Sequence, residues 1–202
     1  MKLHNTPSAF ALLGEDVRTV RRRDPAARSK VEVALAYPGL HALWAHRISH
    51  ALWNRGMVTP ARILSSIARS FTGVDIHPAA RIGRRVFIDH ATGVVIGETA
   101  QVGNDVVIFH GVTLGGVSMT PGKRHPTVGD HVMLGAGSKI LGPITIGSGS
   151  KVGANAVVTK DMPEDSVAIG IPAKIRPTSK PRQRDEDLIV DPCCYEDPSV
   201  YI

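Results

Sequence analysis

The chain has 202 residues, enough for one domain or two small ones, and its 43% hydrophobic content is sufficient for a buried core. No apolar run approaches the ~20 residues of a membrane-spanning helix, and the N-terminus lacks the apolar stretch of a signal peptide, so we expect a cytoplasmic protein. The net charge of +6 suits a polyanionic small molecule, but the basic cluster around Arg21 comes with no nucleic-acid recognition module, and we expect no nucleic-acid partner.

Residues 1–73 have the pattern of an N-terminal α-helical region. Apolar residues recur at helical spacing in three segments, 10–22, 39–56 and 59–73. Thr59 is expected to cap the last of these helices, with Pro60 at its first position and Gly73 at its end. We interpret the apolar stripes of these segments as surfaces for helix–helix packing.

A repeat of six residues dominates residues 74–175. Thirteen aliphatic residues recur at this step in three runs: Ile76, Ile82, Ile88; Ile96, Val102, Ile108, Leu114; and Val128, Leu134, Ile140, Ile146, Val152, Val158. This period fits neither an α-helix nor an ordinary sheet, and it is typical of a parallel β-helix, in which three hexapeptides form one triangular coil. The sequence therefore predicts an α+β fold, with helices followed by a left-handed parallel β-helix of hexapeptide repeats.

Two interruptions break this repeat. Ile88 to Ile96 is a step of eight, and Leu114 to Val128 is a step of fourteen. The longer step requires residues 116–127 to leave the prism as a loop. Breaks of this kind in a regular scaffold are where function is commonly carried.

The chain after residue 175 is rich in Pro, Asp and Arg and shows no periodicity. We therefore expect residues 176–202 to form a flexible C-terminal tail. The adjacent Cys193 and Cys194 lie in this tail, and they support neither a disulfide framework nor a metal site.

A histidine lies beside each interruption. Asp89-His90 precedes the first, and Arg124-His125 ends the second. Coils of about 18 residues bring His90 within reach of Asp75, and such a carboxylate can fix the imidazole tautomer while the other ring nitrogen accepts a proton from a hydroxyl. Arg124 offers a fork of donors suited to a substrate carboxylate. An ordinary surface position is the alternative for each residue.

Small residues offer a possible surface for an extended cofactor. Ala136 and Ala154 are 18 residues apart, so they are expected to stack on one face in successive coils. A cofactor could lie against the backbone there. A simple tight-turn role is equally consistent with the spacing.

These motifs resemble the serine O-acetyltransferases, a family of hexapeptide-repeat acyltransferases. The resemblance rests on five stretches within residues 10–175: 74–80, 88–98, 112–116, 123–126 and 170–173. The combination of Asp-His-Ala-Thr-Gly with Arg-His-Pro is not general among hexapeptide transferases. The resemblance implies transfer of acetyl from the co-substrate acetyl-CoA to the L-serine hydroxyl, the first step of cysteine biosynthesis, with no permanently bound cofactor and no metal.

The same resemblance assigns roles to residues that match the family motifs. It implies that His90 is the general base and Asp75 its orienting partner. The residues implied for serine are Asp24 and Asp89 at the ammonium group, Arg124 at the carboxylate, and His125 beside it. Those implied for acetyl-CoA are Gly116, Ala136, Ala154 and Lys174.

The resemblance also implies protein partners. Family members bind acetyl-CoA between neighbouring β-helices of a trimer, and we expect a homotrimer here because the helical region is shorter than in the long forms that make a dimer of trimers. Ile202 is expected to dock into O-acetylserine sulfhydrylase.

Three other functions remain open from the sequence. A hexapeptide O-acetyltransferase for a sugar or antibiotic would need neither Asp89 nor Arg124. A zinc carbonic anhydrase on this scaffold would need three histidines, and the candidates His90, His110 and His125 have spacings of 20 and 15, which do not match that family's pattern. A binding module acting mainly through Ile202 is the third.

Overall fold

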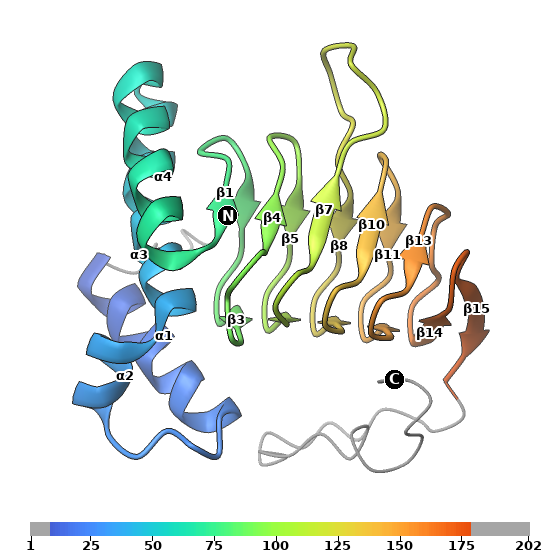
Figure 1. Cartoon of the computed structure of the whole chain (residues 1–202), viewed down its shortest axis with the longest axis horizontal. Helices are drawn as coiled ribbons and strands as arrows, with labels where there is room; N and C mark the ends of the chain where they lie inside the picture. Colours follow the sequence, from blue (N-terminus) through green and yellow to red (C-terminus); the bar gives the residue numbers. More distant parts are fainter. Residues whose placement is uncertain (1–8, 179–202) are drawn as a thin grey trace, which may run out of the picture.

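The computed structural model describes residues 9–178, in which four helices are followed by a prism of short strands (Figure 1). The helices are α1 (Ala9–Arg23), α2 (Lys30–Ala36), α3 (Pro38–Asn54) and α4 (Val58–Thr72). No helix within this described range is long and apolar enough to cross a membrane. The tail from 179 onward, with Cys193, Cys194 and Ile202, lies outside the described residues.

The helix boundaries follow local capping chemistry. Ser29 and Glu32 form a reciprocal capping box at the start of α2, a short helix that the apolar pattern does not predict. The cap expected at Thr59 is wrong, because α4 begins at Val58 and its N-cap is Met57. Gly73 ends α4 as predicted, in the left-handed conformation at φ 72°.

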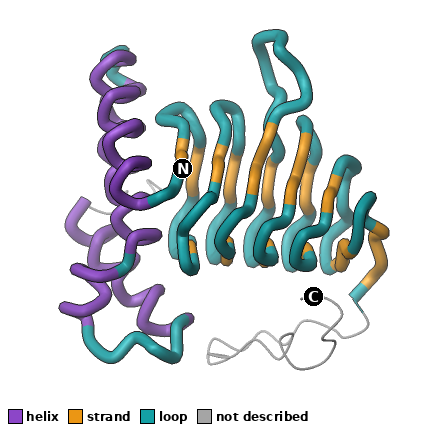
Figure 2. The backbone as a smooth tube through the Cα atoms, in the orientation of Figure 1, coloured by secondary structure: helices purple, strands orange, loops and turns teal. Residues whose placement is uncertain are grey.

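Fifteen strands within the described residues form the prism. They are β1 (Asp75–Ile76), β2 (Arg81–Ile82), β3 (Phe87–Ile88), β4 (Val95–Ile96), β5 (Gln101–Val102), β6 (Val107–Ile108), β7 (Thr113–Gly115), β8 (Thr127–Val128), β9 (Met133–Leu134), β10 (Lys139–Leu141), β11 (Thr145–Ile146), β12 (Lys151–Val152), β13 (Val157–Val158), β14 (Ser166–Ile169) and β15 (Lys174–Pro177). The last strand extends two residues beyond the boundary expected at 175. Figure 2 shows the short strands alternating with turns along the prism.

The strands form three parallel sheets, one on each side of the prism. Sheet A has the order β1-β4-β7-β10-β13, sheet B β11-β8-β5-β2, and sheet C β15-β14-β12-β9-β6-β3, with only β14 and β15 antiparallel. This arrangement is typical of a left-handed hexapeptide-repeat β-helix. The turns from sheet C to sheet A are called the C–A corner below, and those from sheet A to sheet B the A–B corner.

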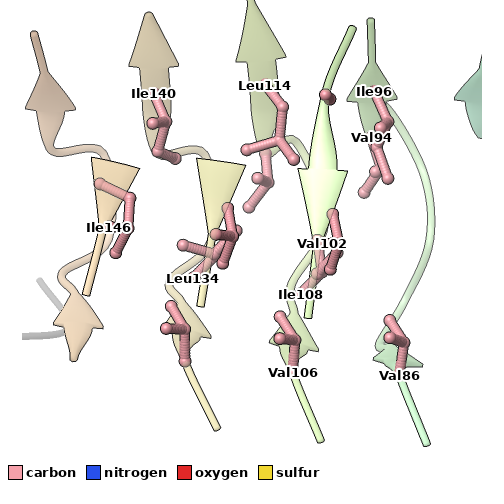
Figure 3. Packing of buried hydrophobic residues seen from close by; sticks show 14 of the residues in the cluster. Val86, Val94, Ile96, Val102, Val106, Ile108, Leu114, Leu134, Ile140 and Ile146 are labelled. Carbon is pink, nitrogen blue, oxygen red and sulfur yellow. The ribbon is translucent and has the colours of Figure 1, made fainter. Parts of the chain in front are cut away.

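The predicted repeat positions form the core. Twelve of the thirteen aliphatic side chains are buried and Ile82 is partly buried against them. They stack in register, for example Ile96 on Leu114 and Leu114 on Ile140. Figure 3 shows these side chains pointing into the prism, together with a second buried row two residues earlier in each repeat, including Val86, Val94 and Val106.

The two interruptions change the coil length locally. Asp75 pairs with Val95, so the first coil has 20 residues because it contains the two-residue insertion, whereas Val95 pairs with Thr113 at the regular 18. The predicted loop 116–127 corresponds to residues 116–126 between β7 and β8, and it projects from the A–B corner (Figure 1).

The helices cover one side and one end of the prism. Val20, Val33 and Leu40 pack against the outer side of sheet C, on Phe87, Val107 and Met133. The sequence predicts that the larger apolar side chains of α4 pack against another helix, and within the single chain this prediction is wrong. Ile63, Ile67 and Phe71 are exposed, and the buried positions are the smaller Ala61, Ser65 and Thr72.

Side chains from the helices cap carbonyl groups of the first coil, whose edge has no further coil to pair with. Ser65 Oγ donates to the Ile76 carbonyl at 2.7 Å, and His50 Nδ1 donates to the Pro78 carbonyl at 2.7 Å. The ring of His46 also bonds to the backbone of Ala80. The helical region therefore terminates the sheet edges as well as covering apolar surface.

The buried His46 is expected to make stability depend on pH. Burial lowers its pKa from 6.5 to about 3, with a further contribution from the neighbouring His50 and Arg47, and its Nδ1 has no partner among the described residues. Below pH 6.5 the imidazole of the unfolded chain binds a proton whereas that of the folded chain does not. The free energy of unfolding should therefore decrease as the pH is lowered from 6.5 towards about 3, by up to about 1.4 kcal/mol per pH unit.

Urea unfolding at a series of pH values from 7 to 4 measures this dependence. His46→Gln should flatten the slope because glutamine keeps a side-chain donor and does not titrate. His131→Gln, at a half-exposed site, is the matched control and should keep most of the slope. Equal slopes in wild type and His46→Gln would contradict the assignment.

Candidate active site

Asp89, His90 and His110 gather at the C–A corner. Asp89 and His90 follow β3, His110 follows β6 in the next coil, and the rings of the two histidines meet edge to face with centroids 5.8 Å apart. His90 Nε2 lies 3.7 Å from Asp89 Oδ2, and the His90 side chain is 73% exposed. The imidazole is therefore accessible to a substrate.

The insertion gives this corner an unusual backbone. His90 and Ala91 both have positive φ, 55° and 58°. Left-handed backbone is unfavourable for residues other than glycine and often accompanies functional sites. The insertion thus adds two left-handed residues to this corner.

Asp24 joins this corner from the helical region. Its Oδ2 accepts a hydrogen bond from Tyr37 Oη at 2.5 Å, and its Oδ1 accepts one from the Ala26 amide at 2.8 Å. Burial raises the pKa of Asp89, and the negative charge of Asp24 raises it further, whereas His90 opposes the rise. Two neighbouring carboxylates, one partly buried, form a site that favours a cation.

The expected contact between Asp75 and His90 is not present in the described chain. Asp75 forms an ion pair with Arg69, at 3.4 Å, and no hydrogen bond or ion pair joins it to His90. The cause is the 20-residue first coil, which places Val95 beside Asp75. The two residues still lie near one corner, since Gly93 donates a backbone hydrogen bond to Gly73.

Arg124 and His125 lie at the A–B corner, at the end of the projecting loop. Arg124 Nη2 contacts Glu98 Oε2 at 2.6 Å. His125 is buried, with its ring against the backbone of Gly97 and Gly116, where an added Cβ would crowd the imidazole. Burial lowers the pKa of His125, and the charge of Arg124 lowers it further, so the ring is neutral at pH 7.

One chain does not bring the two corners together. The strand β4 and its flanking residues separate them, and the five steps from residue 92 to residue 97 span about 17 Å of extended chain. A molecule as small as an amino acid cannot bridge that distance. The carboxylate pair and Arg124 can serve one small ligand only if a second chain contributes.

The residues expected to bind acetyl-CoA lie on both corners. Ala136 and Ala154 stack at the C–A corner, where the Asn155 amide donates to the Ala136 carbonyl at 2.8 Å. Lys174 is exposed at the start of β15. Gly116 instead begins the loop at the A–B corner, close to Arg124 and His125.

The histidines proposed for a zinc site do not converge in one chain. His90 and His110 are neighbours, but His125 lies at the other corner. Within residues 9–178, no group of three His, Cys, Asp or Glu side chains is placed to hold a metal ion.

Three polar residues of these clusters were missed by sequence reasoning. Tyr37 contacts Asp24, and Glu98 and Thr99 contact the end of the loop. Glu98 lies within the stretch 88–98 that carries the family resemblance, and Thr99 directly follows it, which is the one feature that could have drawn attention to them. For Tyr37 the sequence offers no comparable feature.

Comparisons with known proteins agree on one family. Residues 125–160 match the family model described as bacterial transferase hexapeptide (six repeats). A serine acetyltransferase of Mycobacterium tuberculosis is 60% identical over 82% of this chain and 72% of its own length. The structure of soybean serine acetyltransferase complexed with serine matches with TM-score 0.82 and 48% identity, covering 85% of this chain and 70% of that one.

A further structure is a serine acetyltransferase from Brucella abortus in complex with coenzyme A. It matches with TM-score 0.81 and 44% identity, over 84% of this chain and 68% of that one. The similarity in sequence extends over most of the described residues and is accompanied by the same fold. The chain belongs to the serine acetyltransferase family of acyltransferases.

Proposed function

We propose that the chain transfers the acetyl group of acetyl-CoA to the hydroxyl of L-serine, releasing O-acetyl-L-serine and CoA. The observation that carries this proposal is the pairing of opposite charges on the two corners. Asp24 and Asp89 suit an ammonium group, and Arg124 suits a carboxylate. A zwitterion needs both, whereas a sugar or antibiotic acceptor needs neither.

His90 acts as the general base in this proposal. The serine hydroxyl is too weak an acid to ionise beforehand, so His90 removes its proton as the oxygen attacks the thioester carbonyl. Collapse of the tetrahedral intermediate expels the CoA thiolate, which takes up the proton. No acyl-enzyme is required, and residues 74–175 contain no cysteine to form one.

Asp75 is the proposed orienting partner of His90. Its carboxylate is partly exposed and is held by Arg69. To orient the imidazole, Asp75 must exchange that ion pair for a hydrogen bond to His90, and catalytic hydrogen bonds often tighten only when the substrate is bound.

A homotrimer completes the site. The A–B corner of one chain, with Arg124 and His125, faces the C–A corner of the next, with Asp89 and His90. This arrangement is supported by the about 17 Å of chain that separates the corners within one copy. Acetyl-CoA then lies between the chains, along Ala136, Ala154 and Lys174 of one copy and Gly116 of its neighbour. A dimer of trimers remains compatible with these contacts.

Thiol release from acetyl-CoA tests the proposed function. The full-length chain should release CoA at a rate that depends on L-serine and saturates with it, because the two charged clusters recognise both ends of the amino acid. Sugars, amines and aminoglycosides at the same concentration are the control acceptors. Absence of serine-dependent release, or faster release with a sugar, would overturn the proposal.

Two further expectations stay predictions. Ile202, the residue expected to contact O-acetylserine sulfhydrylase, lies outside the described residues. The cytoplasmic location likewise rests on the sequence.

A further inference from the structure

Thr99 lies at the turn between β4 and β5 and touches the end of the loop through all of its polar atoms. Its Oγ1 accepts the backbone amides of Arg124, at 3.0 Å, and His125, at 3.1 Å. The same Oγ1 lies 3.0 Å from His125 Nδ1, and the Thr99 amide donates to that nitrogen at 3.2 Å. The Thr99 carbonyl accepts a hydrogen bond from Lys123 Nζ at 2.8 Å.

These contacts determine the tautomer of His125. A backbone amide can only donate, so His125 Nδ1 must be an unprotonated acceptor. The Thr99 hydroxyl already accepts two amide hydrogens, and its single proton is therefore directed to the same Nδ1. In the neutral ring the remaining proton is then on Nε2. Burial and the charges of Arg124 and Lys123 keep the ring neutral, against a smaller opposing effect of Glu98.

The ring of His125 is also packed against backbone. A Cβ at Gly97 would overlap the ring, and a Cβ at Gly116 would lie 3.3 Å from its Nε2, so a side chain at either position would crowd it. Arg124 is held from two directions, since Thr99 binds its amide and Glu98 binds its guanidinium. One hydroxyl therefore fixes the backbone of two adjacent residues and the ring of one of them.

We propose that Thr99 is the positioning residue that presents His125 as an Nε2–H donor and holds Arg124 beside it, at the carboxylate end of the acceptor substrate. This inference rests on the proposed function for the identity of the substrate. It deepens that function, because it assigns His125 the role of a hydrogen-bond donor and not of a second base. Thr99 itself touches no reacting atom.

The kinetic test compares Thr99→Val with Thr99→Ser. Valine keeps the shape and the backbone amide but leaves two loop amides without their acceptor, so kcat/KM for L-serine should fall about 10- to 100-fold, mainly through KM. Serine retains the hydroxyl and should stay within about 3-fold of wild type. KM for acetyl-CoA should be unchanged in both. Thr145→Val, at an exposed position on sheet B, is the matched control.

A spectroscopic test determines the tautomer of His125 without any measurement of activity. The ¹⁵N NMR signals of His125, assigned by their loss in His125→Gln, should show protonated Nε2 and unprotonated Nδ1 in the wild type at pH 7.5. Thr99→Val should shift them toward a mixture of tautomers, whereas Thr99→Ser and Thr145→Val should not.

The outcomes separate this inference from the proposed function. A wild-type His125 that is charged or protonated on Nδ1 would overturn the inference even if Thr99→Val fails to fold. Equal loss of activity in the valine and serine variants would also overturn it, because the loss would then follow side-chain shape. Absence of serine-dependent activity in the wild type would instead refute the proposed function, and the NMR result would still decide the role of Thr99.

Discussion

His90→Ala should lose turnover with L-serine by about 10²–10⁴-fold, the usual contribution of a positioned general base. The imidazole is an exposed titratable group at the C–A corner, adjacent to the carboxylates of Asp89 and Asp24. KM for serine should change much less than kcat, because the two carboxylates proposed to bind the ammonium remain. Steady-state CoA release with saturating acetyl-CoA measures both constants.

His110→Ala is the matched control for this experiment. His110 is the neighbouring histidine one coil away, with its ring 5.8 Å from that of His90, so its loss perturbs the same surface. Its turnover should stay well above that of His90→Ala. If His110→Ala is the more impaired variant, the base has been assigned to the wrong histidine.

The β-helix itself could be predicted from sequence because one simple constraint acts on every coil. The prism interior admits aliphatic side chains at a fixed step, and the register of Ile96, Leu114 and Ile140 confirms that step. The coil-to-coil contact of Asp75 could not be predicted in the same way. A two-residue insertion shifts the pairing of the first coil by two residues. The sequence pattern shows where the insertion lies, but not which residue then lies beside Asp75.

The helical region was less predictable because burial there depends on tertiary contacts. The large apolar residues of α4, such as Ile67 and Phe71, remain exposed within the chain, while the small Ala61 and Ser65 face α3 and the first coil. Apolar spacing identifies a helix but does not say which face is covered. The length of α2, seven residues, is also too short to show a periodic pattern.

In the candidate site, the charged residues could be identified from the sequence, but the residues that hold them by hydrogen bonds could not. Asp89 and Arg124 stand beside interruptions of the repeat, so their chemistry could be inferred. Tyr37 and Thr99 carry ordinary hydroxyls, and their roles depend on which carboxylate or amide the fold brings within hydrogen-bond distance. That information resides in contacts between distant segments, which no local pattern encodes.

Mixing two inactive variants should restore activity if the site is shared between chains. In the proposed trimer, co-expressed His90→Ala and Arg124→Ala chains can complement each other. A site is intact when an Arg124→Ala chain supplies its C–A corner, with His90, and a His90→Ala chain supplies its A–B corner, with Arg124. Every mixed trimer of either composition has one intact site out of three, so purified mixed trimers should recover to about one third of wild-type activity. Serine-dependent CoA release from mixed trimers, purified through two different tags, measures the recovery.

The control is a mixture in which both substitutions lie at the same corner. Asp89 and His90 are adjacent in the chain, so co-expressed Asp89→Asn and His90→Ala chains can form no intact site in any arrangement, and activity should not recover. Recovery in the first mixture alone therefore identifies a site divided between the corners of neighbouring chains. If neither mixture recovers although mixed trimers form, Arg124 and His90 must act within one chain, and the loop would have to cross the outer face of sheet A to reach the C–A corner.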